Sequence, residues 1–114
     1  MAAAPPGEQH GRMDRRTLLS REDVASDLDG TGFRHDGERL TAEFRTADFA
    51  SAVRLLDTVA VEADGMNHHP DVSLGWGRVE FDLQSHDVGG VTSRDVALAL
   101  RIAEIAGEQG AAAH

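Results

Sequence analysis

The sequence predicts an α+β domain with an antiparallel four-stranded sheet and helices packed on one face of that sheet. In some segments apolar residues recur every three and four positions, which is typical of an amphipathic helix. In others they alternate with polar residues, which is typical of a strand with one buried face. The segments follow the order α-β-β-α-β-β-α, which favours the α+β class.

The length and the ends of the chain predict a single folded domain. A chain of 114 residues holds one core of ordinary size. Residues 1–16 are rich in Ala, Pro, Gly and charge and show no periodicity, so a disordered leader is expected there. Residues 109–114 have the same character and are expected to be a disordered tail. The folded domain is therefore placed at 17–108.

The first half of this domain begins with a short helix and a hairpin. Ser20 is followed three residues later by Asp23, which forms a capping box and predicts a helix to about Leu28. Strand-like runs follow at 32–35 and 39–45. The dipeptide Asp36-Gly37 between them favours a tight hairpin turn.

A long amphipathic helix is predicted over 46–64. Its apolar face consists of Phe49, Ala52, Val53, Leu56, Val59, Ala60 and Ala63. The helix is expected to end at "DGMNHHP", because Gly65 tolerates left-handed geometry and Pro70 disfavours helical geometry in the residue before it. His68 and His69 are thereby placed in a loop after the helix.

Two strands and a last helix complete the pattern. The strands are predicted at 71–76 and 77–86, and a second capping box, Thr92 with Asp95, starts a helix that runs to about Ala106. The apolar residues of this helix form one stripe of Val96, Ala99, Leu100 and Ala103 and a second stripe of Leu98, Ile102 and Ile105. A surface helix needs only one stripe, so the second predicts a contact between subunits.

Composition excludes several classes of function. The chain has 11 Lys+Arg against 20 Asp+Glu, a formal net charge of −9, so direct binding of nucleic acid is not expected. It has no cysteine, which rules out disulfides and thiolate zinc sites. No apolar run approaches the roughly 20 residues that span a bilayer, so no membrane association is expected. A cytoplasmic location is expected.

Three histidines are the candidates for chemistry. His68, His69 and His86 all lie at the boundaries of predicted elements, where polar side chains can face a cleft. Imidazole exchanges protons near neutral pH, so a cluster of histidines suits proton-transfer catalysis without a nucleophile. "GVTSRD" lacks the glycines of a nucleophile elbow, and its Thr92 and Ser93 are explained as helix-start residues.

Other interpretations stay open on spacing alone. The histidine pair can be capping residues of the loop, and His86 a strand-end residue. Three imidazoles can also bind Zn²⁺, although adjacent side chains rarely converge on one ion. Asp95 is either only the acid of a capping box or a residue that orients an imidazole. Trp76 is either an aromatic on the sheet or the wall of a pocket for a flat ring.

Taken together, residues 64–106 closely resemble the pterin-4a-carbinolamine dehydratase family. The matching features are Asp64, "HHP" at 68–70, His86 and "GGVTSRD" at 89–95, and the resemblance extends over about residues 18–106. Two positions depart from the family pattern. Asp64 stands where many members have Glu, and Phe33 stands where Trp is common, a change that affects packing more than chemistry.

The resemblance implies dehydration of a 4a-hydroxytetrahydropterin to the quinonoid dihydropterin, which recycles the pterin cofactor of aromatic amino acid hydroxylases. Loss of water from C4a needs an acid for the leaving hydroxyl and a base for the N5 proton, and no metal or organic cofactor. By similarity, His68 and His86 would act as the acid and base pair near the C4a hydroxyl, and the catalytic role of His69 would be to hold the pterin or also to share the base role.

The remaining site residues implied by the resemblance are supporting ones. Asp95 would orient an imidazole, Asp64 would brace the loop and Pro70 would fix it, while Trp76 would form a wall or a subunit contact. The family also implies a homodimer or homotetramer built by sheet extension and helix packing. The alternative function is a non-catalytic dimerisation or protein-assembly module of the same fold.

Overall fold

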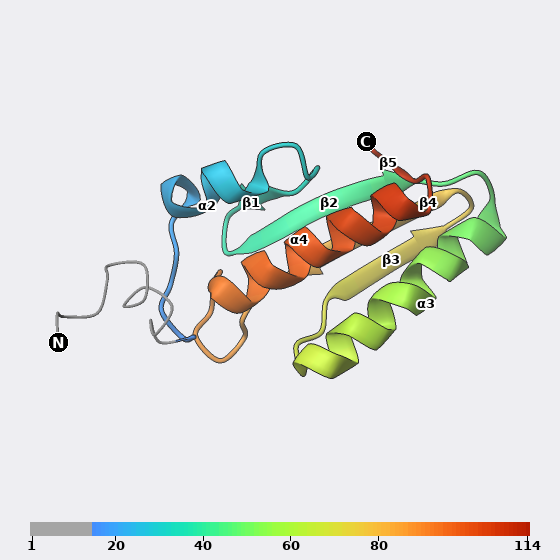
Figure 1. Ribbon diagram of the computed structural model, residues 1–114. Coiled ribbons are helices and arrows are strands. Elements are labelled where there is room, and N and C mark those ends of the chain that lie inside the picture. Colours follow the sequence, from blue (N-terminus) through green and yellow to red (C-terminus); the bar gives the residue numbers. More distant parts are fainter. Residues whose placement is uncertain (1–14) are drawn as a thin grey trace, which may run out of the picture.

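A layer of helices covers one face of an antiparallel sheet in residues 15–114, the part of the chain that the computed structural model describes (Figure 1). The elements are α2 (Arg21–Leu28), β1 (Arg34–Asp36), β2 (Arg39–Arg45), α3 (Phe49–Met66), β3 (Asp71–Gly75), β4 (Arg78–Leu83), α4 (Ser93–Glu108) and β5 (Ala112–Ala113). The predicted fold class and the predicted order of elements up to α4 are confirmed. Of the predicted leader, residues 1–14 lie outside the described part.

The sheet has the strand order β1-β2-β4-β3, and all neighbouring strands are antiparallel. In the β3–β4 hairpin Asp71 is paired with Asp82, and Gly75 is paired with Arg78 beside the turn. The start of β3 and the end of β4 therefore lie at the same end of the hairpin. The segments with the three histidines directly precede β3 and follow β4, so this register brings them to one end of the molecule.

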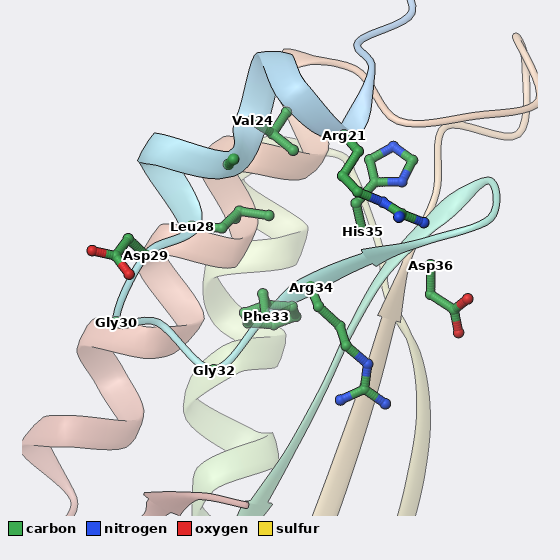
Figure 2. Close-up of a pocket in the computed structure, with 11 residues that line it drawn as sticks. Arg21, Val24, Leu28, Asp29, Gly30, Gly32, Phe33, Arg34, His35 and Asp36 are labelled. Atoms are coloured by element: carbon green, nitrogen blue, oxygen red, sulfur yellow. The ribbon is translucent and has the colours of Figure 1, made fainter.

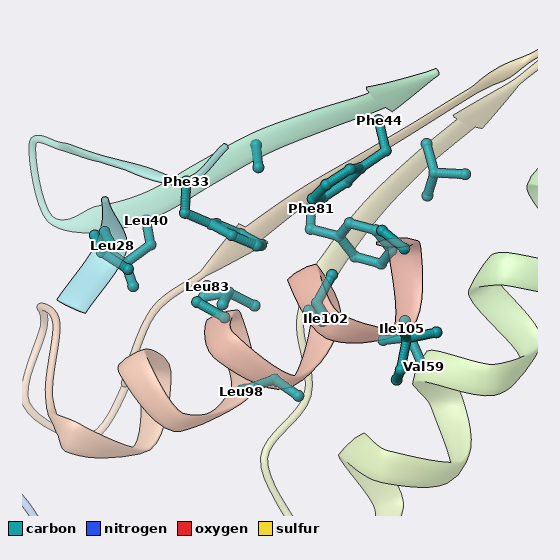
Figure 3. Packing of buried hydrophobic residues seen from close by; sticks show 14 of the residues in the cluster. Leu28, Phe33, Leu40, Phe44, Val59, Phe81, Leu83, Leu98, Ile102 and Ile105 are labelled. Atoms are coloured by element: carbon teal, nitrogen blue, oxygen red, sulfur yellow. The ribbon is translucent and has the colours of Figure 1, made fainter. Parts of the chain in front are cut away.

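The core lies between the sheet and the helices (Figure 3). Alternate residues of the two central strands are buried there: Leu40, Ala42, Phe44, Val79, Phe81 and Leu83. Phe44 makes edge-to-face contacts with Phe33 and with Phe81, at centroid distances of 6.0 and 6.1 Å. Phe33 is 5% exposed, so this departure from the family pattern lies in the core and outside the histidine region.

Helix α4 buries its second apolar stripe within one chain. Leu98 and Ile102 are fully buried and Ile105 is 1% exposed. The physical reason is that α4 lies between α2 and α3 above the sheet, so it has neighbours on both sides (Figure 1). The inference of a subunit contact from this second stripe was therefore wrong.

Helix α3 presents part of its predicted apolar face to solvent instead. Its buried residues are Ala52, Leu55, Val59 and Ala63. Phe49 is 50% exposed, Val53 42% and Val61 67%. The buried face is rotated from the predicted one because α3 packs against both α4 and the β3–β4 hairpin. Part of the exposed apolar surface of the described residues thus lies on α3.

The end of α3 differs from the prediction by two residues. Gly65 is helical, and the left-handed residue is Asn67, with φ 52° and ψ 42°. The His68 N–H donates to the Ala63 carbonyl and the Asn67 N–H to the Asp64 carbonyl, which closes the helix. Asparagine adopts this conformation more readily than most residues, so no glycine is required there.

The predicted disordered tail contains a short strand in the structure. Ala112 and Ala113 form β5, which pairs with Arg45 and Phe44 of β2. The His114 N–H donates to the Glu43 carbonyl. Gly32 permits this approach, since a Cβ at that position would lie 2.6 Å from the Cβ of Ala113. Backbone pairing with β2 therefore orders these residues, which have no large apolar side chain.

The burial of α4 predicts opposite effects for two leucines two positions apart. Leu98→Ala should lower the free energy of unfolding by about 2–5 kcal/mol, because it leaves a cavity in the core. Leu100 is 42% exposed, so Leu100→Ala should change it by less than about 1 kcal/mol. Urea denaturation followed by circular dichroism measures both. Equal losses would contradict the arrangement of α4.

Candidate active site

The candidate site is built on the buried pair of His68 and Asp95. The His68 Nε2 lies 2.6 Å from the Asp95 Oδ1, and their side chains are 10% and 0% exposed. His68 directly follows the cap of α3, and Asp95 lies in the first turn of α4. The two readings of Asp95 are therefore compatible: its Oδ2 accepts the Thr92 N–H of the capping box, while its Oδ1 faces the imidazole.

Two buried hydroxyls complete the surroundings of Asp95. The Ser85 hydroxyl donates to the Asp95 Oδ2 over 2.7 Å. The Ser85 and Thr92 hydroxyl oxygens lie 2.8 Å apart and are hydrogen-bonded. A buried carboxyl group is stable only when its oxygens are hydrogen-bonded. Here His68, Ser85 and the Thr92 backbone supply those bonds.

His69 has its own carboxylate. Its Nε2 lies 2.9 Å from the Asp64 Oδ1, and the side chains are 57% and 78% exposed. Asp64 lies in the last turn of α3, so this contact links the loop to the helix that precedes it. The contact shows that an aspartate at this position reaches the loop. Pro70, half-buried, separates His69 from β3.

His86 is the most exposed of the three histidines. Its Nε2 lies 3.9 Å from the Asp71 Oδ2, with side-chain exposures of 70% and 78%. The next residue, Asp87, accepts a hydrogen bond from the Arg94 guanidinium over 2.8 Å. That bond lowers the pKa of Asp87 below its ordinary value of 3.8. It also ties the His86 loop to the first turn of α4.

The structure thus places each imidazole beside a different aspartate, all at the end of the β3–β4 hairpin where α3 ends and α4 begins. No contact joins one imidazole directly to another among the hydrogen bonds described above. The single cleft expected to contain all three side chains stays a prediction.

Trp76 lies away from this region. It occupies the turn between Gly75 and Gly77, at the opposite end of the β3–β4 hairpin from the histidines, and is 74% exposed. Within one chain it therefore cannot form a wall beside His68. The other role suggested for it, a contact between subunits, stays a prediction.

A separate hollow of about 720 Å³ lies between α2 and β1 (Figure 2). Its lining includes apolar Val24, Leu28 and Phe33 and also Arg21, Arg34 and His35. The Nε2 of His35 is buried without a hydrogen-bond partner. Asp29 and Asp36 also line it, so its charges are mixed. None of the three candidate histidines borders this hollow, and it has no pair of imidazoles for acid and base chemistry.

The described residues contain no cluster suited to a metal ion. Within residues 15–114, no group of three or more His, Cys, Asp or Glu side chains is arranged so that it could hold one. The three candidate histidines do not form such a group, because His68, His69 and His86 each turn Nε2 toward a different carboxyl group.

Sequence reasoning missed two residues of the site, Ser85 and Asp71. Ser85 directly precedes His86, and Asp71 directly follows Pro70, so both stand beside residues that the motif singled out. Serine and aspartate are common at strand ends, and nothing in their spacing predicts contact with Asp95 or His86. Adjacency to the motif is the only sequence signal that could have indicated them.

Comparison with known proteins identifies the family. The model of the family described as pterin 4 alpha carbinolamine dehydratase matches residues 17–105. A Nocardia farcinica protein, provisionally named a pterin-4-alpha-carbinolamine dehydratase, is 38% identical over 90 residues, which cover 78% of this chain and 95% of the relative. A Metallosphaera sedula protein with the same provisional name is 39% identical over 88 residues, or 76% of this chain and 92% of the relative.

Solved structures agree with this result. The crystal structure of a transcriptional coactivator/pterin dehydratase from Brucella melitensis has a TM-score of 0.74 and 28% identity, and the match covers 80% of this chain and all of the other. A pterin dehydratase-like protein described as a RuBisCO assembly factor of the alpha-carboxysome has a TM-score of 0.57 at 24% identity and shows a likeness of fold alone. The chain belongs to the pterin-4a-carbinolamine dehydratase family.

No helix within residues 15–114 is long and apolar enough to cross a membrane.

The link between Asp87 and Arg94 predicts a measurable titration. In wild-type protein the Asp87 carboxyl should titrate below 3.8, and in Arg94→Met its pKa should rise toward 3.8. A pKa lowered by folding stabilises the fold above the ordinary pKa, and this contribution is lost as the pH falls through the folded value. Carboxyl ¹³C NMR measures the titration.

Arg101→Met is the matched control for this titration. It removes another arginine of α4, which donates to Glu62 and not to Asp87, and should leave the Asp87 titration unchanged. An Asp87 pKa that does not move in Arg94→Met would contradict the proposed cause.

Proposed function

We propose that this protein catalyses dehydration of a 4a-hydroxytetrahydropterin to the quinonoid dihydropterin by histidine acid and base catalysis, and so recycles the pterin used by aromatic amino acid hydroxylases. The observation that supports it most is the placement of three imidazoles, each beside its own aspartate, at one end of the β3–β4 hairpin. Family membership supports the choice of a pterin as substrate.

The reaction needs two proton transfers. An acid protonates the C4a hydroxyl, the C4a–O bond breaks and water leaves. A base takes the proton from N5, and the electron pair of the N5–H bond forms the C4a=N5 double bond. His68 and His86 serve as the acid and base pair. His69 holds the pterin.

The carboxylates make these imidazoles suitable for proton transfer. A carboxylate beside one ring nitrogen fixes the orientation of the ring, which leaves the other nitrogen to meet the substrate. His68 has the strongest such support, since Asp95 is fully buried. His69 and His86 are exposed enough to contact a ligand from solvent.

The alternative is a non-catalytic dimerisation or protein-assembly module. Exposed apolar side chains on α3 favour some interaction between proteins. A relative with the same fold is described as an assembly factor, and another as both coactivator and dehydratase. A pure scaffold does not need three imidazoles paired with aspartates, so the enzyme is preferred.

Replacement of the histidines tests the function. With synthetic 4a-hydroxytetrahydropterin, wild-type protein should accelerate dehydration over buffer, and chelators should have no effect. His86→Ala should lower kcat on the order of a hundredfold, the usual contribution of one acid or base group. His68→Gln should act similarly while its amide N–H still reaches Asp95. His69→Ala should raise KM more than it lowers kcat.

His114→Ala is the matched control for the same assay, because His114 is exposed and directly follows β5, where its N–H donates to the Glu43 carbonyl of β2. Its activity should equal that of the wild type. The dehydratase function is rejected if wild-type protein does not exceed buffer, or if His86→Ala and His68→Gln both keep full activity. The assembly module would then be preferred.

We further propose a homodimer or homotetramer in which α3 forms a contact. Phe49 and Val53 lie one turn apart on the exposed face of α3, and burial of such a surface stabilises association. Val53→Glu should therefore lower the mass observed in sedimentation at micromolar concentration. Ser26→Glu on the exposed side of α2 should leave it unchanged. A wild-type mass of 12.2 kDa would exclude the oligomer.

A further inference from the structure

Ser85 occupies the junction between the two histidines proposed as acid and base. Its side chain is bonded to Asp95, which faces His68, and its backbone directly precedes His86. The Ser85 N–H donates to the Gly90 carbonyl, and the Ser85 carbonyl accepts from the Val88 and Gly89 N–H groups. Ser85 thus closes the loop that contains His86 and contacts the carboxyl group that faces His68.

The direction of each hydrogen bond follows from a count of protons. A carboxylate can only accept, so the single hydroxyl proton of Ser85 points to the Asp95 Oδ2. The Ser85 oxygen must then accept from the Thr92 hydroxyl. The Thr92 oxygen in turn accepts from the Arg94 N–H and Nε–H. In this series of hydrogen bonds, the Thr92 hydroxyl therefore donates to Ser85 and the Ser85 hydroxyl donates to Asp95.

The same count applies to His68. The Asp95 Oδ1, as an acceptor, requires the proton of the 2.6 Å contact on the His68 Nε2. The neutral ring then has its lone pair on Nδ1. When the ring is protonated, Nδ1 also holds the proton that can leave. In both forms the exchangeable position is Nδ1.

We propose that Ser85 is a positioning residue, which holds Asp95 so that His68 stays in the Nε2–H form and exchanges protons with the pterin through Nδ1. This inference rests on the proposed dehydratase function for its catalytic consequence. It adds a residue and a reacting atom that the histidine motif does not contain. Ser85 itself is 1% exposed and does not touch the substrate.

The hydroxyl of Ser85 is the part of the network that can be removed with least disturbance. In Ser85→Ala, Asp95 keeps the Thr92 backbone N–H as a bond to Oδ2, so the capping box of α4 remains. The carboxyl group loses one of the two donors that fix its Oδ2, and it can turn away from His68. A merely structural serine would affect stability but not the state of the His68 ring.

NMR of ¹⁵N-labelled histidine tests the tautomer without any substrate. In wild-type protein the neutral His68 ring should show a protonated Nε2 and an unprotonated Nδ1, with a low-field proton for the short bond to Asp95. In Ser85→Ala the low-field signal should weaken and the two tautomers should mix. A wild-type His68 with its proton on Nδ1 would overturn the proposal, and so would unchanged spectra in Ser85→Ala.

Kinetics test the consequence for catalysis. Ser85→Ala should lower kcat about ten- to hundredfold, the size expected from loss of one hydrogen bond to a charged group, with KM little changed. Ser85→Thr keeps the hydroxyl and should restore most of the activity. Ser26→Ala, the same deletion on the exposed side of α2, should match the wild type. Full activity in Ser85→Ala would overturn the proposal.

Two further results separate the possible failures. If circular dichroism shows that Ser85→Ala does not fold, Ser85→Cys replaces it, because cysteine keeps the volume and has only a weak donor. Ser85→Cys should lower both kcat and the intensity of the low-field signal. No change in either quantity overturns the proposal. If wild-type protein is inactive toward the pterin, the proposed function fails, while the His68 spectra still decide whether Ser85 holds the tautomer.

Discussion

The buried carboxyl group of Asp95 is the constraint on which the candidate site depends. It is 0% exposed, and such a group is destabilising unless its oxygens are hydrogen-bonded. Its partners come from three separate places: the loop after α3, the end of β4 and the start of α4. These segments must therefore meet. The same bonds that satisfy the buried charge also fix the position of His68, so stability and the geometry of the site are coupled.

The central position of α4 allows the loop after α3, the end of β4 and the start of α4 to contact one another. The stripe of Leu98, Ile102 and Ile105 is buried by α2, α3 and the sheet, so the helix N-terminus stays above the end of the β3–β4 hairpin. Helix α3 packs on one side only and leaves Phe49, Val53 and Val61 exposed. Association through this surface would not require any residue of the histidine region. The association and the catalysis proposed above would therefore use different residues of this chain.

The site divides into a buried half and an exposed half. His68 and Asp95 lie in a network closed by Ser85 and Thr92, whereas His69 and His86 pair with exposed aspartates. A buried imidazole bonded through Nε2 has one defined orientation. Exposed imidazoles can adjust to a ligand and exchange protons with water. The proposed dehydration, in which one proton is given and one is taken, would suit this combination of a fixed and an adaptable imidazole.

The sequence by itself determined the fold class and the order of elements up to α4, because periodicity and capping boxes are local. It also singled out His68, His69 and His86 as candidates, because a family motif is linear. The rotation of α3, the burial of Leu98 and Ile102, the pairing of β5, and the contacts of Ser85 and Asp71 were decided only by the tertiary structure. These features depend on which neighbours a residue meets across the fold. An apolar stripe looks the same in sequence whether a second helix of the same chain or another subunit covers it, and a serine looks the same whether its hydroxyl meets water or a buried aspartate.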